Sequence, residues 1–302
     1  MRFLRTAWGR RLLLGLISAL AFSLSFRWTF PGDALLQRVQ HEMRKQTRGL
    51  WQVNAEDITL SGLLGLRLEK VKISRMGRDK RDVALDALEL HVGPFTFLGR
   101  SKSGQIHVEQ GDGSMDVHAR GGGPTGEWTF ETDMDEMPLA WLSGLMPESS
   151  KIPLGGTLTG EIQGHLGGAQ GEITGKAKIA ALQVGPGIVT GLTVPPLGFG
   201  QLDLTVATSG GETTFNIGSA EGADVALSLD ASSRLQNDWK RSSLRGCMQV
   251  LPSEATLQKN ETMRSAWEIA SIRFRKDDKG RLSIPLQGMV GAPNIGVGVC
   301  SR

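Results

Sequence analysis

Hydrophobic and polar residues alternate with a period of two over most of the chain after residue 50. The runs are short, and glycines or charged turns separate them. Alternation places successive side chains on opposite faces of a strand, so the pattern predicts half-buried antiparallel strands joined in a meander. The apolar positions of the clearest runs are Leu66, Leu68, Val71, Ile73, Val83, Leu85, Leu88, Leu90, Val92, Ile106, Val108, Met115, Val117, Leu202, Leu204, Val206, Phe215, Ile217, Val225, Leu227 and Leu229.

Glycine strengthens this interpretation. The 302 residues include 40 glycines, which are costly inside helices and useful at turns and bulges. A G-x-x-x-G unit occurs at 156–160 and again at 171–175, each followed by alternating residues. We therefore expect a mainly β fold: an elongated, curved antiparallel sheet, open or partly closed, with a few short helices.

Helical spacing is found in only a few places. Over 31–48, Leu35, Leu36, Val39 and Met43 recur at helical spacing and predict an amphipathic helix. Such a helix could lie on anionic lipid as a surface helix or lid, or its apolar face could plug the end of the β-domain, and the second interpretation is favoured. Shorter helices are predicted over 138–146 and 253–265, and a closing hairpin over 267–275 and 281–286 around the turn 277–280.

The N-terminus predicts a membrane anchor. Residues 12–30 are apolar apart from Arg27 and a few small polar residues and span about 28 Å as a helix, close to the thickness of a bilayer core. Four arginines precede this stretch, so the positive-inside rule leaves 1–11 as a cytoplasmic tail and places 49–302, the β-rich domain, on the far side. The predicted anchor residues are Leu12, Leu13, Leu14, Leu16, Ile17, Leu20, Phe22, Leu24, Phe26 and Trp28.

A cleaved signal peptide is the competing interpretation, because Ala19-Leu20-Ala21 has the A-x-A form of a cleavage site. Retention is favoured because the apolar stretch continues to Phe30 and ends in interfacial aromatic residues. A mature protein that begins at Phe22 would overturn this prediction.

Charge and aromatic content argue against nucleic acid as a partner. Of 34 basic residues, five precede the first acidic residue, Asp33, so the remainder has 29 basic and 31 acidic residues. The basic character belongs to the N-terminus and not to a surface of the domain. The chain has no tyrosine, which disfavours a stacking surface for bases or sugars.

The two cysteines, Cys247 and Cys300, both lie in the predicted exported region, 53 positions apart. An oxidising compartment favours a disulfide between them, and closing a loop of that length would stabilise the fold by roughly 4 kcal/mol. Two unpaired thiols remain the alternative.

Motifs that carry chemistry are weak or incomplete. Residues 171–176 resemble a phosphate loop, but its glycines are one residue too close and Ala177 replaces the magnesium-binding hydroxyl. His41-Glu42 begins a zincin motif that fails at Lys45. A solvated turn explains the acidic residues Asp133, Asp135 and Glu136 better than a calcium site or an acid–base pair does, and there is no G-x-S-x-G. We therefore expect no catalytic, metal-binding or cofactor-binding residues.

Three segments, together with the basic tail and the membrane helix, carry a resemblance to a known family. They are 60–73 (LSGLLGLRLEKVKI), 153–160 (PLGGTLTG) and 280–288 (GRLSIPLQG), the last followed by Ala292-Pro293. In these features the chain resembles the type II secretion system protein N family, within the wider group of AsmA-like envelope proteins.

The resemblance implies a non-enzymatic protein of the Gram-negative inner membrane, with a single membrane helix and a periplasmic β-domain, which serves the type II machine for protein export. Its expected partners are other secretion-system subunits and the membrane. The alternative implied by the AsmA-like resemblance is a module that binds or transfers phospholipid in an apolar β-groove.

Overall fold

The structure, a computed structural model, describes residues 32–62, 65–76, 81–93, 96, 102–121, 127–144, 152–166, 171–189, 192–219, 223–234, 242–290, 292–296 and 300. The predicted cytoplasmic tail 1–11 and membrane helix 12–30 lie outside these residues. Within the described ranges, no helix combines the length and the apolar character that crossing a membrane requires.

Sixteen strands of the described residues form one long open antiparallel sheet. The alternation predicted an antiparallel meander, and the structure shows that it stays open. A separate pair, β10 (Gly187–Val189) and β11 (Leu192–Val194), forms a small hairpin. The strands of the large sheet are β1 (Trp51–Asn54), β2 (Asp57–Ser61), β3 (Gly65–Arg75), β4 (Arg81–Val92), β5 (Lys102–Gln110), β6 (Gly113–Gly121), β7 (Trp128–Pro138), β8 (Leu154–Leu166), β9 (Glu172–Val184), β12 (Leu197–Ser209), β13 (Glu212–Ser219), β14 (Val225–Arg234), β15 (Ser243–Pro252), β16 (Arg275–Lys276), β17 (Leu282–Met289) and β18 (Ala292–Ile295).

The strand order follows the sequence. From β3 to β9, and again from β12 to β15, each strand pairs with the next one along the chain, and β9 pairs with β12 across the small hairpin. The two ends of the sheet are built alike. The outer edge of β3 carries both β1 and β2, and the outer edge of β17 carries both β16 and β18.

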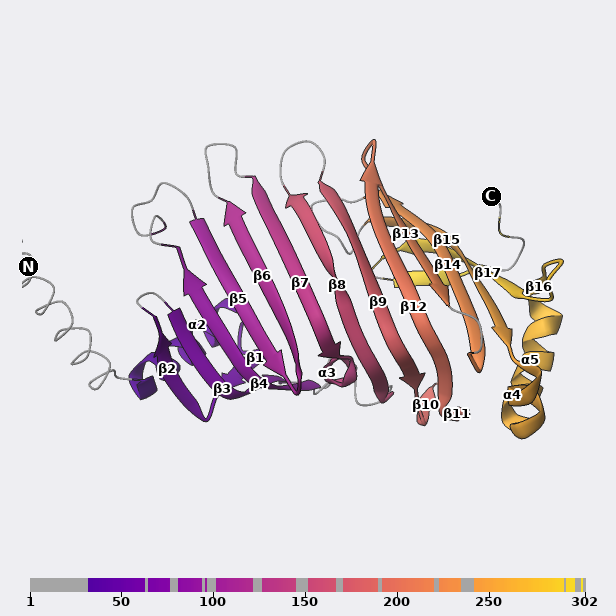
Figure 1. Cartoon of the computed structure of the whole chain (residues 1–302), viewed down its shortest axis with the longest axis horizontal. Coiled ribbons are helices and arrows are strands. Elements are labelled where there is room, and N and C mark those ends of the chain that lie inside the picture. Colours follow the sequence, from indigo (N-terminus) through magenta and orange to yellow (C-terminus); the bar gives the residue numbers. More distant parts are fainter. Residues whose placement is uncertain are drawn as a thin grey trace, which may run out of the picture.

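The sheet is curved. Figure 1 shows α2 and β1 lying behind the first long strands and β13 to β17 turning behind β12. Along one side of the sheet, the backbone adopts positive φ at Lys70, Glu136, Gly156, Ala181 and Gly200, on β3, β7, β8, β9 and β12. The register shifts beside four of these residues, on β7, β8, β9 and β12. Because bulges bend a strand and increase its twist, this row of irregularities bends the sheet along one side.

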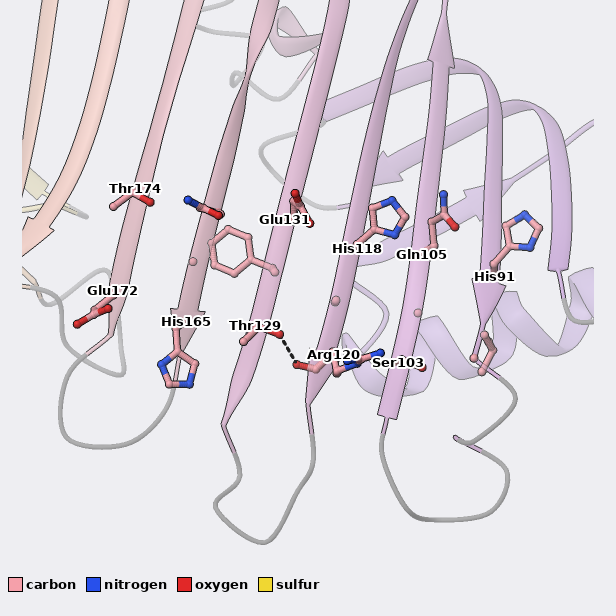
Figure 2. Close-up of a pocket in the computed structure, with 17 residues that line it drawn as sticks. His91, Ser103, Gln105, His118, Arg120, Thr129, Glu131, His165, Glu172 and Thr174 are labelled. Carbon is pink, nitrogen blue, oxygen red and sulfur yellow. Dashed lines mark hydrogen bonds between the residues drawn. The ribbon is translucent and has the colours of Figure 1, made fainter.

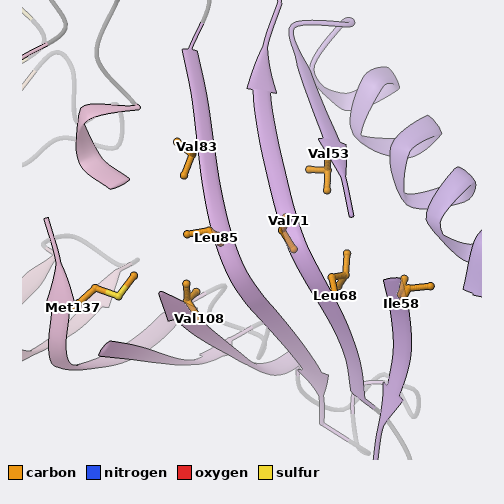
Figure 3. Close-up of a cluster of buried hydrophobic side chains, with 8 residues drawn as sticks. All are labelled: Val53, Ile58, Leu68, Val71, Val83, Leu85, Val108 and Met137. Carbon is orange, nitrogen blue, oxygen red and sulfur yellow. The ribbon is translucent and has the colours of Figure 1, made fainter. Parts of the chain in front are cut away.

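Short helices pack mainly near the start of the sheet. Helix α2 (Gly32–Gln46) contacts β1 and β2, and α3 (Ala140–Ser143) contacts β4 and β8. Leu35, Leu36 and Met43 of α2 and Trp141 of α3 pack against a buried cluster drawn in Figure 3, whose members are Val53, Ile58, Leu68, Val71, Val83, Leu85, Val108 and Met137. The apolar face of α2 therefore covers one end of the sheet.

The C-terminal hairpin differs from the prediction. Residues 267–275 were expected to form a strand, but Trp267 lies within helix α5 (Glu261–Arg273), which follows α4 (Glu254–Lys259). The Asn260 side chain caps α5 by accepting a hydrogen bond from the backbone N–H of Met263. The half-buried residues Met263, Trp267, Ala270 and Phe274 recur at helical spacing, so a period of 3.6 fits this segment as well as the alternation does. The predicted turn 277–280 and second strand, β17, are present, but the first strand is reduced to the short β16, which pairs with β17 across the turn.

Candidate functional site

An apolar row crosses the sheet from β3 to β17. In each of these twelve strands, the residue at this level pairs directly with its neighbour on the next strand, and none of the twelve is charged or polar. The row consists of Leu68, Leu88, Val108, Met115, Met134, Gly160, Ala177, Leu204, Ile217, Leu229, Met248 and Ile284. At about 4.8 Å per strand, it extends for roughly 50 Å.

A second row runs beside the first on the same face, two residues along each strand. Its single polar member is Thr132, and no member is charged. The row consists of Leu66, Leu90, Ile106, Val117, Thr132, Ile162, Gly175, Val206, Phe215, Ala231, Gly246 and Leu286. We call the surface formed by these two rows the apolar face.

The apolar face is most buried at the start of its first row and is mostly half-buried elsewhere. Leu68 and Val108, near α2 and α3, are 2% and 5% exposed. Beyond β9, most members, such as Leu204, Val206 and Phe215, are half-buried. The main helix contacts in the described part of the chain are with β1, β2, β4, β8 and β16, and the main contacts of the middle strands β12 to β14 are with other strands. The described helices therefore leave most of the apolar face beyond β9 half-buried.

Glycines on the apolar face mark where the strands crowd together. A Cβ on Gly160 would lie less than 3.0 Å from the backbone of Lys176 and Ala177 on β9. A Cβ on Gly175 would meet the backbone of Ile162 at 2.9 Å. Directly opposed side chains in an ordinary antiparallel pair are about 4.5–5.5 Å apart at Cβ, so the sheet bends tightly toward the apolar face here. The apolar face therefore lies on the inside of the curve.

The opposite face is polar. Figure 2 shows one of its rows, in which His91, Gln105, His118 and Glu131 stand on consecutive strands and pair directly. Together with the neighbouring row from Ser103 to Glu172, these residues line a shallow hollow of about 810 Å³. Its side chains are a mixture of imidazoles, amides, hydroxyls and both charge signs, without one dominant chemistry.

A charge cluster lies at the β3–β5 part of the polar face. The Arg67 guanidinium donates to Glu89 and, at 2.8 Å, from Nη2 to Oε2 of Glu109. The hydrogen bond from Arg67 lowers the pKa of Glu89 to about 2 and also holds the pKa of Glu109 below its usual value. His107 extends the cluster, with Nδ1 2.8 Å from Oδ1 of Asp116. Each of these charged side chains has a partner on another strand, which is the arrangement of a structural ion-pair network.

The residues considered as possible metal-binding, phosphate-binding or catalytic groups in the sequence do not lie together in the structure. Asp133 and Asp135 lie on the polar face of β7, and Glu136 occupies one of the bulges. His41 is exposed on α2, and 172–176 lie within β9. Among the described residues, no group of three or more His, Cys, Asp or Glu side chains could hold a metal ion. The two cysteines are joined: Cys247 of β15 and Cys300 form a disulfide with a Cα–Cα distance of 5.6 Å.

The sequence predicted an apolar β-groove only as an alternative function, and it did not identify the residues that form it. The alternation shows that each strand has an apolar side, but the pairing register decides whether those sides align across twelve strands. A search of family models, a search of curated proteins and a search of solved structures each find no match to the chain. The function is therefore inferred from the geometry of the apolar face.

Proposed function

We propose that this protein is a membrane-anchored envelope protein that holds the acyl chains of lipids along its apolar face. One observation carries the proposal: two adjacent rows without a charged side chain cross twelve strands of the sheet, and most of their members are only half-buried. A large uncovered apolar surface is unfavourable in water and marks a binding site. A surface of roughly 50 Å is much longer than one leaflet of a bilayer core, about 15 Å, so it can hold several chains.

The position of the apolar face fits a lipid occupant. Helix α2, which covers one end of this face, begins at Gly32, two residues after the predicted membrane helix 12–30 ends. The covered end therefore lies next to the predicted membrane surface, from which acyl chains would come. The absence of charge along the two rows also matches hydrocarbon, since a charged side chain facing an acyl chain would be costly.

Photo-crosslinking at paired positions tests this proposal. Phe215 belongs to the apolar face of β13, and its neighbour Thr214 is exposed on the polar face. In the full chain, each position is replaced in turn by p-benzoylphenylalanine, and cells are irradiated after their phospholipids have been labelled with ³²P. We expect a labelled adduct from position 215 and background labelling from position 214.

A second variant links the adduct to the apolar face. Val206 pairs directly with Phe215, so Val206→Asp places a charge beside the probe, while Ala207→Asp places the same charge on the other face. Val206→Asp should remove most of the labelling at 215, and Ala207→Asp should leave it intact. Equal labelling from positions 214 and 215, or none from 215 in the otherwise unchanged chain, would contradict the proposal.

We also propose, from the resemblance of the sequence, that the protein is a non-enzymatic component of a type II secretion system in the Gram-negative inner membrane. The resembling segments fall in the β2–β3 hairpin, in β8 and in β17, that is, at the start, middle and end of the sheet. Deletion of the gene should impair export of the system's substrates. Unchanged export would remove this role and leave the lipid proposal standing.

Sheet edges offer little room for partners of such a system. The outermost strands, β1, β2, β16 and β18, are only four, five, two and four residues long. Addition of a strand from another protein needs a longer run of unpaired backbone groups. Secretion-system subunits would therefore bind through side chains of the polar face or through the ends of the molecule.

A further inference from the structure

Helix α5 carries two isoleucines that do not contribute to the fold. Ile269 is 69% exposed and Ile272 is 88% exposed, more than the other exposed large hydrophobic residues of the described chain. None of the thirteen residues of α5 is fully buried. The side of the helix that packs on the molecule uses the half-buried residues Met263, Trp267 and Phe274 instead. A bare isoleucine pair on a short helix is costly in water unless it has an apolar environment to enter.

Three exposed cations follow the two isoleucines closely in the sequence. They are Arg273 in the last turn of α5 and Arg275 and Lys276 in β16, while Glu268 precedes the isoleucines and Asp277 of the following turn bonds Arg281. Two of the cations are held close to aromatic rings, with Arg273 5.7 Å from the centre of Phe274 and Lys276 5.4 Å from that of Trp267. Exposed aliphatic side chains beside a cluster of cations are typical of a helix that lies on an anionic membrane surface.

Helix α5 lies far from the helix that follows the predicted membrane anchor. In Figure 1, α4 and α5 lie at the end of the molecule opposite to α2, which follows the predicted anchor. Measured along the curved sheet, the path from β3 to β17 between the two ends is roughly 50 Å, from about 4.8 Å per strand. We propose that the surface formed by Ile269, Ile272, Arg273, Arg275 and Lys276 binds the anionic headgroup layer of a second membrane. This inference stands on the exposure and charge of α5 and does not require lipid on the apolar face.

Capture of vesicles by the immobilised protein tests the proposal. The full chain is held on a sensor through an N-terminal tag, with its predicted membrane segment enclosed in a zwitterionic nanodisc. Vesicles of phosphatidylglycerol and phosphatidylcholine, or of phosphatidylcholine alone, then flow over the surface. We expect capture of the anionic vesicles, weaker capture as salt concentration rises, and little capture of the zwitterionic vesicles.

Substitutions in α5 separate insertion from nonspecific adhesion. The double variant Ile269→Asp/Ile272→Asp should reduce capture at least tenfold, because withdrawing even one aliphatic side chain from hydrocarbon costs about a tenfold loss in affinity. The matched control is Leu50→Asp, which changes a residue that is 48% exposed at the other end of the molecule and should leave capture unchanged. Circular dichroism of all variants checks that they fold.

Three results would overturn the proposal. They are the absence of capture by the unchanged chain, equal capture by the double variant, and equal capture of both vesicle types. None of these results would affect lipid labelling at position 215, so the failure of this inference and the failure of the proposed function are distinguishable.

Discussion

Arg67 explains how two carboxylates can stand close together on neighbouring strands. Glu89 and Glu109 would repel each other if they faced only one another, and like charges across a sheet are destabilising. The Arg67 guanidinium bonds both, and its side chain is 30% exposed against 18% for that of Glu89, so solvent screens the interaction only in part. The pKa of Glu89 falls to about 2 as a result.

Acid should weaken this network in a defined range of pH. The pKa of Glu89 is lowered on folding from 4.5 to about 2, so its stabilisation is complete above about pH 4.5 and is lost as the pH falls toward 2. Arg67→Met should lower the free energy of unfolding at neutral pH by about 2 kcal/mol and flatten its decline between pH 5 and 2. Urea unfolding of the full chain in detergent, followed by circular dichroism at several pH values, measures both effects.

Lys72→Met is the matched control, because the Lys72–Asp82 pair is more than half exposed on both sides. Its effect should stay within about 0.5 kcal/mol at all pH values. An unaltered pH dependence in Arg67→Met would show that other carboxylates govern acid unfolding.

Removal of the disulfide should destabilise the C-terminal end of the sheet. Cys247 lies within β15, and its bond to Cys300 closes a loop with a sequence separation of 53 residues. Cys247→Ser should lower the free energy of unfolding by about 4 kcal/mol, through the conformational freedom gained by the unfolded chain. The comparison is made by urea unfolding against the unchanged chain. Reductant should lower the free energy of unfolding of the unchanged chain but not that of Cys247→Ser, which lacks the disulfide. An equal decrease in both proteins would contradict the prediction.

Single residues could be predicted only where they act locally. The Ser253 cap of α4 and the charged turn around Asp277 follow from neighbouring residues in the sequence. Arg67 and Glu109, by contrast, are 42 positions apart and meet only because two hairpins bring β3, β4 and β5 into register. No local pattern contains that information.

At the level of structural elements, strands can be predicted from the sequence more readily than the bends within them. A period of two is visible wherever a strand has one apolar side, and so the meander could be predicted. Three of the bends depend on Lys70, Glu136 and Ala181 at positive φ, a conformation for which side-chain-bearing residues give little signal. The curvature of the sheet was expected, but its location was not.

Helix α5 shows a different limit. Residues 267–275 alternate well enough to predict a strand, yet the spacing of Trp267, Ala270 and Phe274 also fits one side of a helix. The Asn260 cap favours the helix, because its side chain accepts a hydrogen bond from the backbone N–H of Met263 at the start of the helix. A short segment with two compatible periods cannot be assigned from hydrophobicity alone.

Gly160 should be a sensitive position in the sheet. Any side chain there would press on the backbone of Lys176 and Ala177, where the strands crowd on the inside of the curve. Gly160→Val should therefore lower the free energy of unfolding by about 2 kcal/mol through overpacking, despite the higher strand propensity of valine. Gly218 of β13 has open space around its Cβ position, so Gly218→Val is the control and should cost little. Thermal unfolding of the two variants gives the comparison, and equal shifts would contradict the account of the curve.

The sheet as a whole is protected against growth at both ends. Each terminal long strand is covered by two short strands, which leaves brief and interrupted edges. Short edge strands are one of the ways in which proteins avoid edge-to-edge association. Sedimentation velocity of the full chain in detergent should accordingly show one chain per micelle as concentration rises. A dimer that grows with concentration would indicate that these edges, or the apolar face, pair between copies.

The open architecture is the part of the fold that lay furthest beyond sequence reasoning. Whether an alternating sheet closes into a barrel, stacks on a second sheet or stays open depends on long-range pairing and on bends such as those at Gly156 and Gly200. The alignment of Leu204, Ile217 and Leu229 into one row likewise depends on register.

The meander also makes the size of the protein adjustable. Because the long strands pair mostly with their neighbours in sequence, a duplicated or deleted hairpin would disturb only the two strands beside it. Each hairpin adds two strands, or about 10 Å, to the length of the sheet. Duplication or deletion of hairpins within the gene could therefore lengthen or shorten the sheet in equal steps. The length of the protein could in this way be matched to the width of the compartment that it occupies.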